Sequence, residues 1–249
     1  MNLNNRFYEC FKERAAEITI KNLTFGLGYT SVTTSNNETG ICYTYFDSKK
    51  GCSMISKFKN YESESGLNLL EEIKGKDTIL RSGAIALINA LNYNNAITLP
   101  EDSDNSVLMK EVAPVEGSKV CMAGYFHPIV KMLEERKAIV EIFDISKKIG
   151  DEKDFYNKLE KWADSFILTS TSLINGTAEG ILAKTRKDCK TVLLGPSTPM
   201  VKEPFENYNI SMLCGFVPSN SAMVLTSVRQ GAGTMVLNKW GKKSYLAFF

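Results

Sequence analysis

The stretch KVCMAGYFHPIVKMLEERKAIVEIFD, residues 119–144, decides the fold of this chain. Its two short apolar runs, 119–124 and 138–144, flank the segment PIVKMLEERK, in which apolar side chains recur at helical spacing. A strand, a helix and a second strand in this order form a βαβ unit with parallel strands. The stretch therefore predicts a parallel sheet with helices on its faces.

The same alternation continues toward the C-terminus. Further apolar runs cover 164–170, 190–195 and 209–215, and helical segments cover 151–162 and 176–187. A helix over 219–230 and the glycine-rich corner GAG (231–233) close this part of the chain. We therefore expect an α/β domain over residues 109–249.

Residues 1–108 have a different pattern. Extended segments over 18–34 and 40–46 are rich in Thr, Tyr and Ile, which predicts two or three antiparallel strands. Helical patterns cover 65–75 and 77–93, and the second is apolar on nearly all sides, so we expect it to be buried. These patterns predict an α+β domain. The proline-containing, acidic stretch 99–117 is predicted to be the linker that follows it.

Composition excludes several classes of function. The chain has 249 residues, 30 Lys and Arg against 28 Asp and Glu, and a net charge of +2. This balance argues against a nucleic-acid partner, which needs a concentrated basic face. No apolar run approaches the roughly 18 residues of a membrane span. The N-terminus lacks a signal-peptide core, so we expect no membrane association and a cytoplasmic location.

Histidine and cysteine usage limits metal chemistry. His127 is the only histidine, which excludes a zinc site with two or more histidines from one chain. None of the six cysteines forms a C-x-x-C pair, so zinc-finger and thioredoxin-type interpretations fail. We expect several cysteines to pack as small buried apolar residues.

Ligands of open parallel sheets bind at the carboxyl ends of the strands. The residues there are mostly small or hydroxylic, and they form two stiff loops. Hydroxyl loops of this kind favour a ligand with a carboxylate or phosphate, unless the hydroxyls only satisfy their own turns. The candidate residues are Gly124, Thr169, Ser170, Thr171, Gly195, Pro196, Ser197 and Thr198.

Two further residues at strand ends have two interpretations each. His127, just before Pro128, either acts on a ligand as acid, base or metal ligand, or packs locally. Asp144 either holds the ribose of a nucleotide or caps the next segment. The G-x-G-x-x-G spacing of dinucleotide-binding turns is absent after 119–124, which favours the capping role of Asp144.

Three polar residues, Arg81, Ser82 and Asn89, interrupt the apolar helix over 77–93, and a buried polar group needs a partner. Arg81 either pairs with an acid or faces the crevice between the two halves. Asn89 either stabilises a neighbouring backbone or binds a ligand.

The segments GYFHPIVKMLEER, FILTSTSLINGTAEGIL, VLLGPSTPM and QGAGT resemble the bacterial and archaeal family labelled putative heavy-metal chelation. GLGYTSVTT, GICYTY and SGAIALINALN resemble the enolase-N-like domain that accompanies it. The resemblance covers nearly the whole chain. It implies an enolase N-terminal-like α+β domain over 1–108, a Rossmann-like α/β domain over 109–249, a site in the cleft between them, and a homodimer.

The resemblance also implies which residues form the site: His127, Thr169 to Thr171, Asn175, Gly195 to Thr198 and, from the first half, Asn89. The ligand it implies is a transition metal, a metal chelate or a small anionic metabolite. One histidine and dispersed cysteines are too few for a tight protein-only metal site, whereas a chelate brings its own donor atoms.

Two other functions stay open. The first is a small-molecule enzyme in which His127 is the general acid/base. The second is a domain that binds a nucleotide or an S-adenosylmethionine-type cofactor through Gly124 and Asp144. The absent glycine spacing weighs against the second.

Overall fold

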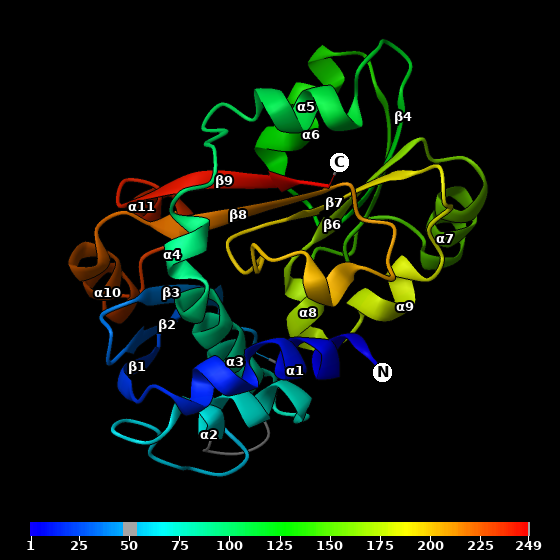
Figure 1. The fold of residues 1–249 in the computed structure, drawn as a ribbon. Coiled ribbons are helices and arrows are strands. Elements are labelled where there is room, and N and C mark those ends of the chain that lie inside the picture. The colour runs from blue at the N-terminus through cyan, green and yellow to red at the C-terminus, as the bar shows by residue number, and fades with distance from the viewer. Residues whose placement is uncertain (47–53, 249) are drawn as a thin grey trace.

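The computed structural model describes residues 1–46 and 54–248, which form two sheets and the helices around them (Figure 1). The larger sheet has six strands in the order β5-β4-β6-β7-β8-β9, and the smaller has three in the order β1-β2-β3. Within these residues, no helix has the length and apolar content that a membrane crossing requires.

The first five strands of the large sheet are parallel, as predicted. They are β4 (Lys119–Ala123), β5 (Ile139–Phe143), β6 (Ser165–Thr169), β7 (Lys190–Leu194) and β8 (Met212–Pro218). The last strand, β9 (Gly241–Ala247), pairs antiparallel with β8 and was not predicted. Its sequence GKKSYLA lacks an apolar run because it lies at the sheet edge and is mostly half-buried.

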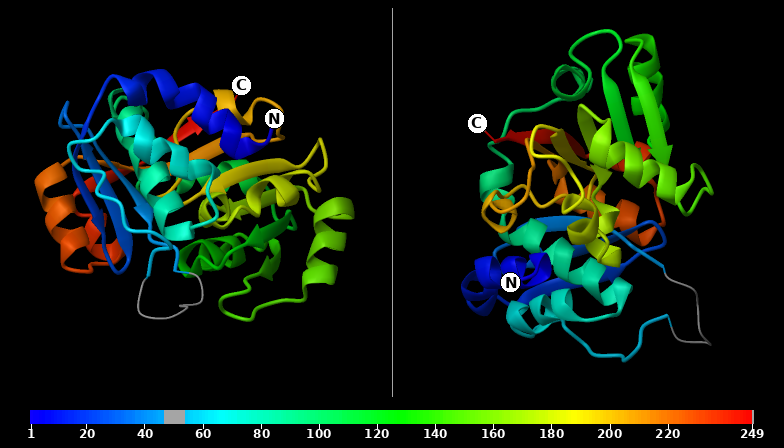
Figure 2. Two further views of the ribbon diagram at one scale, coloured as in Figure 1. Left: turned by 90° about the horizontal axis from the view of Figure 1, so that it is seen from below. Right: turned by 90° about the vertical axis from the view of Figure 1, so that its right-hand side faces the viewer.

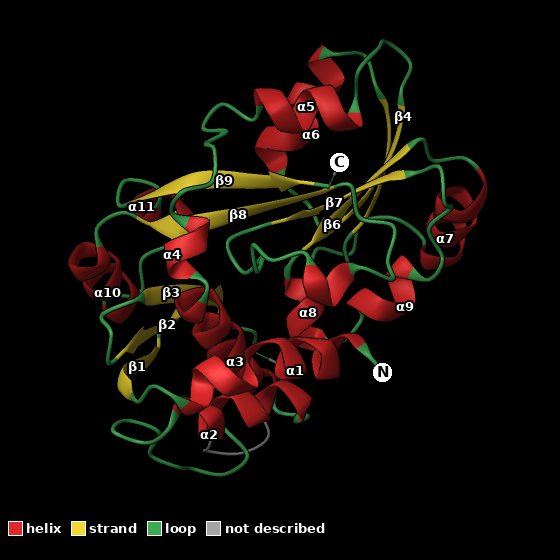
Figure 3. Ribbon diagram, viewed as in Figure 1, coloured by secondary structure: helices red, strands yellow, loops and turns green. Residues whose placement is uncertain are grey.

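Helices cover both faces of this sheet (Figure 3). On one face, α5 (Ser106–Val112) and α6 (His127–Glu135) pack against alternate strand residues that include Val120 and Met122. On the other face lie α7 (Glu152–Lys161), α8 (Thr171–Asn175) and α9 (Ala178–Leu182), against residues such as Cys121 and Ala123. Helix α5 falls in the stretch predicted as a linker, and the predicted boundary between residues 108 and 109 lies inside it.

The N-terminal part begins with α1 (Leu3–Ala16) and continues as the antiparallel strands β1 (Ile20–Phe25), β2 (Tyr29–Thr34) and β3 (Thr39–Tyr43). Four short or buried helices follow: α2 (Gly66–Leu70), the 3-10 helix η1 (Glu71–Lys74), α3 (Thr78–Leu91) and α4 (Tyr93–Ala96). Asp77 caps α3 by accepting from the amides of Ile79 and Leu80 at 3.0 and 3.1 Å. Nearly every residue of α3 is buried, as its sequence predicted.

The two parts share one core. Helix α3 covers one face of the small sheet, and α10 (Ser221–Arg229), from the C-terminal part, covers the other (Figure 2, left). All residues of β2 are therefore buried, although its sequence YTSVTT is largely hydroxylic. Strands β8 and β9 extend past β6 and β7 to the small sheet, where Phe216 packs with Tyr29 and Ile41.

The remaining elements are the 3-10 helix η2 (Glu203–Phe205) and α11 (Thr234–Leu237). Of the described cysteines, Cys10 is partly buried and the other four are buried, which confirms that several pack as apolar residues. Burial raises the pKa of the Cys121 and Cys189 thiols to about 12. Cys52 lies outside the described residues.

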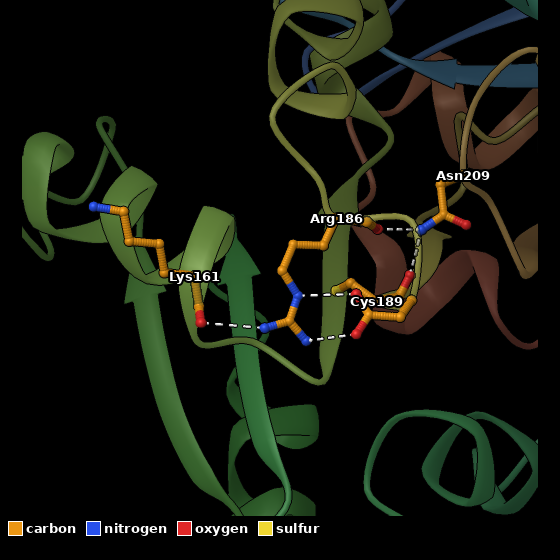
Figure 4. A network of polar contacts seen from close by, with 5 residues as sticks. Lys161, Arg186, Cys189 and Asn209 are labelled. Carbon is orange, nitrogen blue, oxygen red and sulfur yellow. Dashed lines mark hydrogen bonds and ion pairs between the residues drawn. The ribbon is translucent and has the colours of Figure 1, made fainter.

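A polar network closes the amino ends of the parallel strands (Figure 4). The Arg186 guanidinium donates to the Lys161 carbonyl and to both carboxylate oxygens of Asp188. The side-chain amide of Asn209 donates to the backbone carbonyls of Arg186 and Cys189, both at 2.6 Å. The polar groups at this end of the sheet thus stabilise one another.

Candidate functional site

The strand order places a topological switch point between β4 and β6. From β4 the chain passes to β5 on one side, and then to β6, β7 and β8 on the other. The loops that leave the carboxyl ends of β4 and β6 diverge at such a point and leave a crevice where ligands bind. Gly124 follows β4, and Thr169 ends β6.

Two glycines make room for the hydroxylic residues that follow β6. Gly124 has φ +90°, and a Cβ there would lie 2.8 Å from the Thr169 Cβ. Gly195 has φ +139°, and a Cβ there would lie 2.5 Å from the Ser170 Oγ. Both the backbone conformation and the close approach require glycine. The ends of β4 and β7 therefore pack closely against Thr169 and Ser170 from either side.

A cavity of about 450 Å³ opens at this edge of the sheet. It lies on the face covered by α5 and α6, and it reaches across β8 and β9 to α11. Most of the site residues predicted from sequence line it, and they come from three different strand ends. They are His127, Thr169, Ser170, Thr171, Gly195, Pro196 and Ser197.

Four predicted residues lie outside the lining. The side-chain amide of Asn89 donates to the backbone carbonyl of Ile41 on β3 at 2.8 Å, so Asn89 stabilises a neighbouring backbone. The side-chain Oδ1 of Asn175 accepts from the backbone amide and the hydroxyl of Thr177 at 3.1 and 2.7 Å. Gly124 packs under Thr169, and Thr198 is buried. Ligand contacts of these four residues stay predictions.

Two tyrosines from the small sheet complete the wall of the cavity. Tyr29 and Tyr43 face each other across β2 and β3, with ring centroids 6.0 Å apart in an edge-to-face arrangement. The Tyr29 hydroxyl lies 2.6 Å from the Thr234 Oγ1, and the Tyr43 amide donates to the Ser197 Oγ at 2.8 Å. Neither ring is predicted from the sequence, because only the strand register and the docking of the two sheets bring them to the cavity.

The cavity also contains charged groups that sequence analysis missed. The Asp102 carboxylate accepts from the amides of Val107 and Leu108 at 3.0 and 2.9 Å at the start of α5. The Lys243 ammonium, on β9, donates to the Ser103 carbonyl at 3.3 Å. Asp102 was not predicted because its segment was interpreted as a linker. Lys243 was not predicted because its segment was interpreted as the end of the domain.

His127 occupies the first turn of α6, with Pro128 next to it. Its imidazole lines the cavity, and its Nδ1 lies 3.1 Å from the Tyr125 hydroxyl. The start of α6 has no side-chain cap, but Pro128 has no N–H and the Ile129 amide donates to the Phe126 carbonyl at 2.9 Å, so the first turn leaves the His127 amide beside the cavity.

Asp144 serves the local backbone. It accepts from the amides of Tyr125 and Lys147 at 2.9 and 3.0 Å and from the Ser146 hydroxyl at 2.6 Å. Burial acts to raise the pKa of this carboxyl, but these hydrogen bonds outweigh burial and lower it. The contacts agree with the capping interpretation and leave little of the carboxylate for a ribose.

Arg81 lies between the two parts of the molecule but outside the cavity lining. Its guanidinium donates to the backbone carbonyl of Gly75, the residue that follows η1. It also donates to the backbone carbonyl of Ile174, in α8. Its partners are thus backbone carbonyls and not the acid that sequence analysis considered. Arg81 joins the α+β part to the parallel sheet.

The cavity does not fit a bare heavy-metal ion. Among residues 1–46 and 54–248, no three His, Cys, Asp or Glu side chains gather as a ligand set. Cys214 lines the cavity, but burial raises the pKa of its thiol well above the ordinary range, so the metal-binding thiolate is disfavoured. The Asp102 oxygens already accept backbone hydrogen bonds. His127 alone cannot hold such an ion tightly.

Comparisons with known proteins agree with this fold. A family model described as putative heavy-metal chelation matches residues 108–247, and a second with the same description matches residues 8–92. An uncharacterized protein from Methanocaldococcus jannaschii is 21% identical over 252 residues, which cover 97% of this chain and 95% of that protein.

Two crystal structures of proteins of unknown function from the same family are similar throughout. The Pyrococcus horikoshii protein has a TM-score of 0.82 and 20% identity, over 99% of this chain and 100% of that one. The Desulfitobacterium hafniense protein has a TM-score of 0.76 and 18% identity, over 98% and 99%. The likeness in both cases is one of fold.

Proposed function

The chain belongs to the putative heavy-metal chelation family, and from this premise we propose that it binds a small organic anion in the cavity between its two parts. Metal chelates are included where the organic part supplies the donor atoms. The observation that carries this proposal is the cavity at the switch point of the sheet, which hydroxylic residues from two strand ends line.

The polar groups around the cavity favour negative charge. The first turn of α6 has no side-chain cap and presents the His127 amide and the positive end of the helix dipole. Thr169 and Thr171, which are half-buried, add hydroxyl groups that can donate. An organic anion satisfies these donors, whereas a bare cation does not.

A catalytic role is the second candidate. The imidazole of His127 lines the cavity and lies within hydrogen-bond distance of the Tyr125 hydroxyl, which can hold one tautomer. A histidine placed in this way can exchange a proton with a bound ligand.

The binding proposal is tested by ligand capture. Purified protein is incubated with a metabolite extract and desalted, and the retained small molecules are identified by mass spectrometry. Thr171→Phe fills the cavity, and Thr185→Phe is the control because Thr185, equally half-buried, lies outside the lining. We expect a compound retained by the wild type and by Thr185→Phe but lost in Thr171→Phe. Equal retention by all three proteins contradicts the proposal.

The same extract tests catalysis. A compound that disappears with the wild type but persists with His127→Ala supports the enzyme, and an unchanged extract supports binding alone. The homodimer and the cytoplasmic location stay predictions, and native mass spectrometry of the purified protein measures the first.

A further inference from the structure

We propose that the cavity selects a planar aromatic acid and that Lys243 binds its acid group. This inference rests on the proposed binding function and narrows it. Two features of the cavity carry it: a lysine that pairs with no carboxylate of the described residues, and two groups of aromatic rings on separate elements.

Lys243 brings a positive charge that the described residues do not neutralise. Its ammonium donates to the Ser103 carbonyl at 3.3 Å, and among residues 1–46 and 54–248 no carboxylate lies within ion-pair distance of it. Asp102, the acidic residue of the lining, is engaged by three donors at the start of α5. The Asp102 carboxylate keeps its charge, but these donors hold both of its oxygens, so the half-buried Lys243 ammonium is the charged group left to bind an anionic ligand.

The aromatic residues form two groups. Tyr29, Tyr43 and Phe216 come from the small sheet and from the part of β8 that packs on it. Tyr125, Phe126 and His127 come from the loop between β4 and α6. A cavity lined by this many aromatic rings favours a ligand with a flat π face over an aliphatic ligand of the same charge.

The two groups of rings come from different strand ends. Tyr43 is hydrogen-bonded to Ser197, which follows β7, and Tyr125 follows β4. In the sheet, β6 lies between these two strands. Lys243, on β9, lines the same cavity, so a planar acid bound there has rings of both groups and an ammonium as its neighbours.

Calorimetry with defined probes tests the inference. The aromatic acids are 2,3-dihydroxybenzoate and phenyl phosphate, which distinguish a carboxylate from a phosphate. Catechol supplies the ring without the acid, and citrate supplies acid groups without the ring. Lys243→Gln removes the charge and Lys243→Arg keeps it. Lys131→Gln removes a charge from the exposed face of α6.

We expect at least one aromatic acid to bind the wild type. Lys243→Gln should weaken that binding about tenfold or more, and Lys243→Arg should restore much of it, because a charge-assisted hydrogen bond is lost and regained. Catechol should bind more weakly and be insensitive to Lys243→Gln. Lys131→Gln should bind all probes like the wild type, and melting curves should show that each variant is folded.

Three outcomes overturn the inference. If neither aromatic acid binds, or if Lys243→Gln binds them as the wild type does, the role of Lys243 is wrong. If citrate binds in a Lys243-dependent manner and aromatic acids do not, the aromatic class is wrong, while the proposed anion binding stands. Failure of the proposed function itself has a different signature, because Thr171→Phe then retains the same compounds from an extract as the wild type.

Discussion

The backbone amide of Tyr43, at the end of β3, donates a 2.8 Å hydrogen bond to the hydroxyl of Ser197, in the loop after β7. This bond joins the small sheet to the carboxyl edge of the large one, beside the candidate cavity. Ser197 is fully buried, so water cannot replace its hydroxyl without a rearrangement. The same pair therefore contributes to stability and to the shape of the site.

Ser197→Ala leaves the Tyr43 amide without its acceptor. We expect the free energy of unfolding to fall by about 1–3 kcal/mol, the cost of an unsatisfied buried polar group. Urea titration followed by circular dichroism measures it. Ser219→Ala is the control because Ser219 is exposed, and its loss should change stability by less than about 0.5 kcal/mol. Equal effects of the two variants would show that the bond contributes nothing.

Gly195→Ala tests the close packing of Gly195 against Ser170. The new Cβ would lie 2.5 Å from the Ser170 Oγ on a backbone with φ +139°, so we expect a loss of about 1–3 kcal/mol. Gly180→Ala, in α9, meets no atom within 4 Å and should be neutral or slightly stabilising. Thermal melts compare the two. A neutral Gly195→Ala would mean that the loop relaxes without cost.

Arg81→Met tests the junction between the two parts. The variant loses charged hydrogen bonds to the carbonyls of Gly75 and Ile174, and we expect destabilisation of about 1.5–3 kcal/mol. Hydrogen exchange should show faster opening of η1 and α8 than of the other helices. Arg229→Met, on the exposed end of α10, is the control. Uniform or absent effects on exchange would contradict the role of Arg81 as a junction residue.

The parallel sheet could be predicted from sequence because its strands are buried on both faces and appear as apolar runs separated by helical segments. Strand β9 could not, because an edge strand with Lys242 and Lys243 has no such run. Helix α5 was hidden in a proline-containing stretch, where Asp102 provides the helix start from outside the helix. Local patterns predicted the two-part architecture, and the family resemblance implied the enolase N-terminal-like and Rossmann-like folds of the two parts.

The candidate site was predictable to the extent that strand ends define it. His127, Thr169 to Thr171 and Ser197 follow strands directly, so the parallel topology alone gathers them at one edge. Tyr43 and Lys243 reach the cavity through the docking of the small sheet and through β9. Contacts of this kind depend on tertiary packing between distant segments, for which local sequence has no periodic signal.

The donor set predicts weak binding of bare metal ions. The described residues contain no cluster of metal ligands, and the Cys214 thiol has a raised pKa. We expect Zn²⁺ or Cu²⁺ without a chelator to leave the melting temperature nearly unchanged, and elemental analysis to find no stoichiometric metal after dialysis. A large stabilisation by Zn²⁺ that disappears in His127→Ala would contradict this prediction.

Asp144 predicts an acid-dependent loss of stability. Burial acts to raise the pKa of its carboxyl, but bonds from Ser146, Tyr125 and Lys147 lower it below the unfolded-state value. A carboxyl with a lowered folded-state pKa stabilises the fold above its unfolded-state pKa of about 4, and this contribution is lost as the pH falls through the folded-state pKa. Asp144→Asn should thus be less stable than the wild type at neutral pH, with the difference shrinking below about pH 4. Urea unfolding across this range measures the difference, with the exposed Glu116→Gln as control. A gap that stays constant from neutral to acid pH would show that the charge of Asp144 contributes nothing to stability.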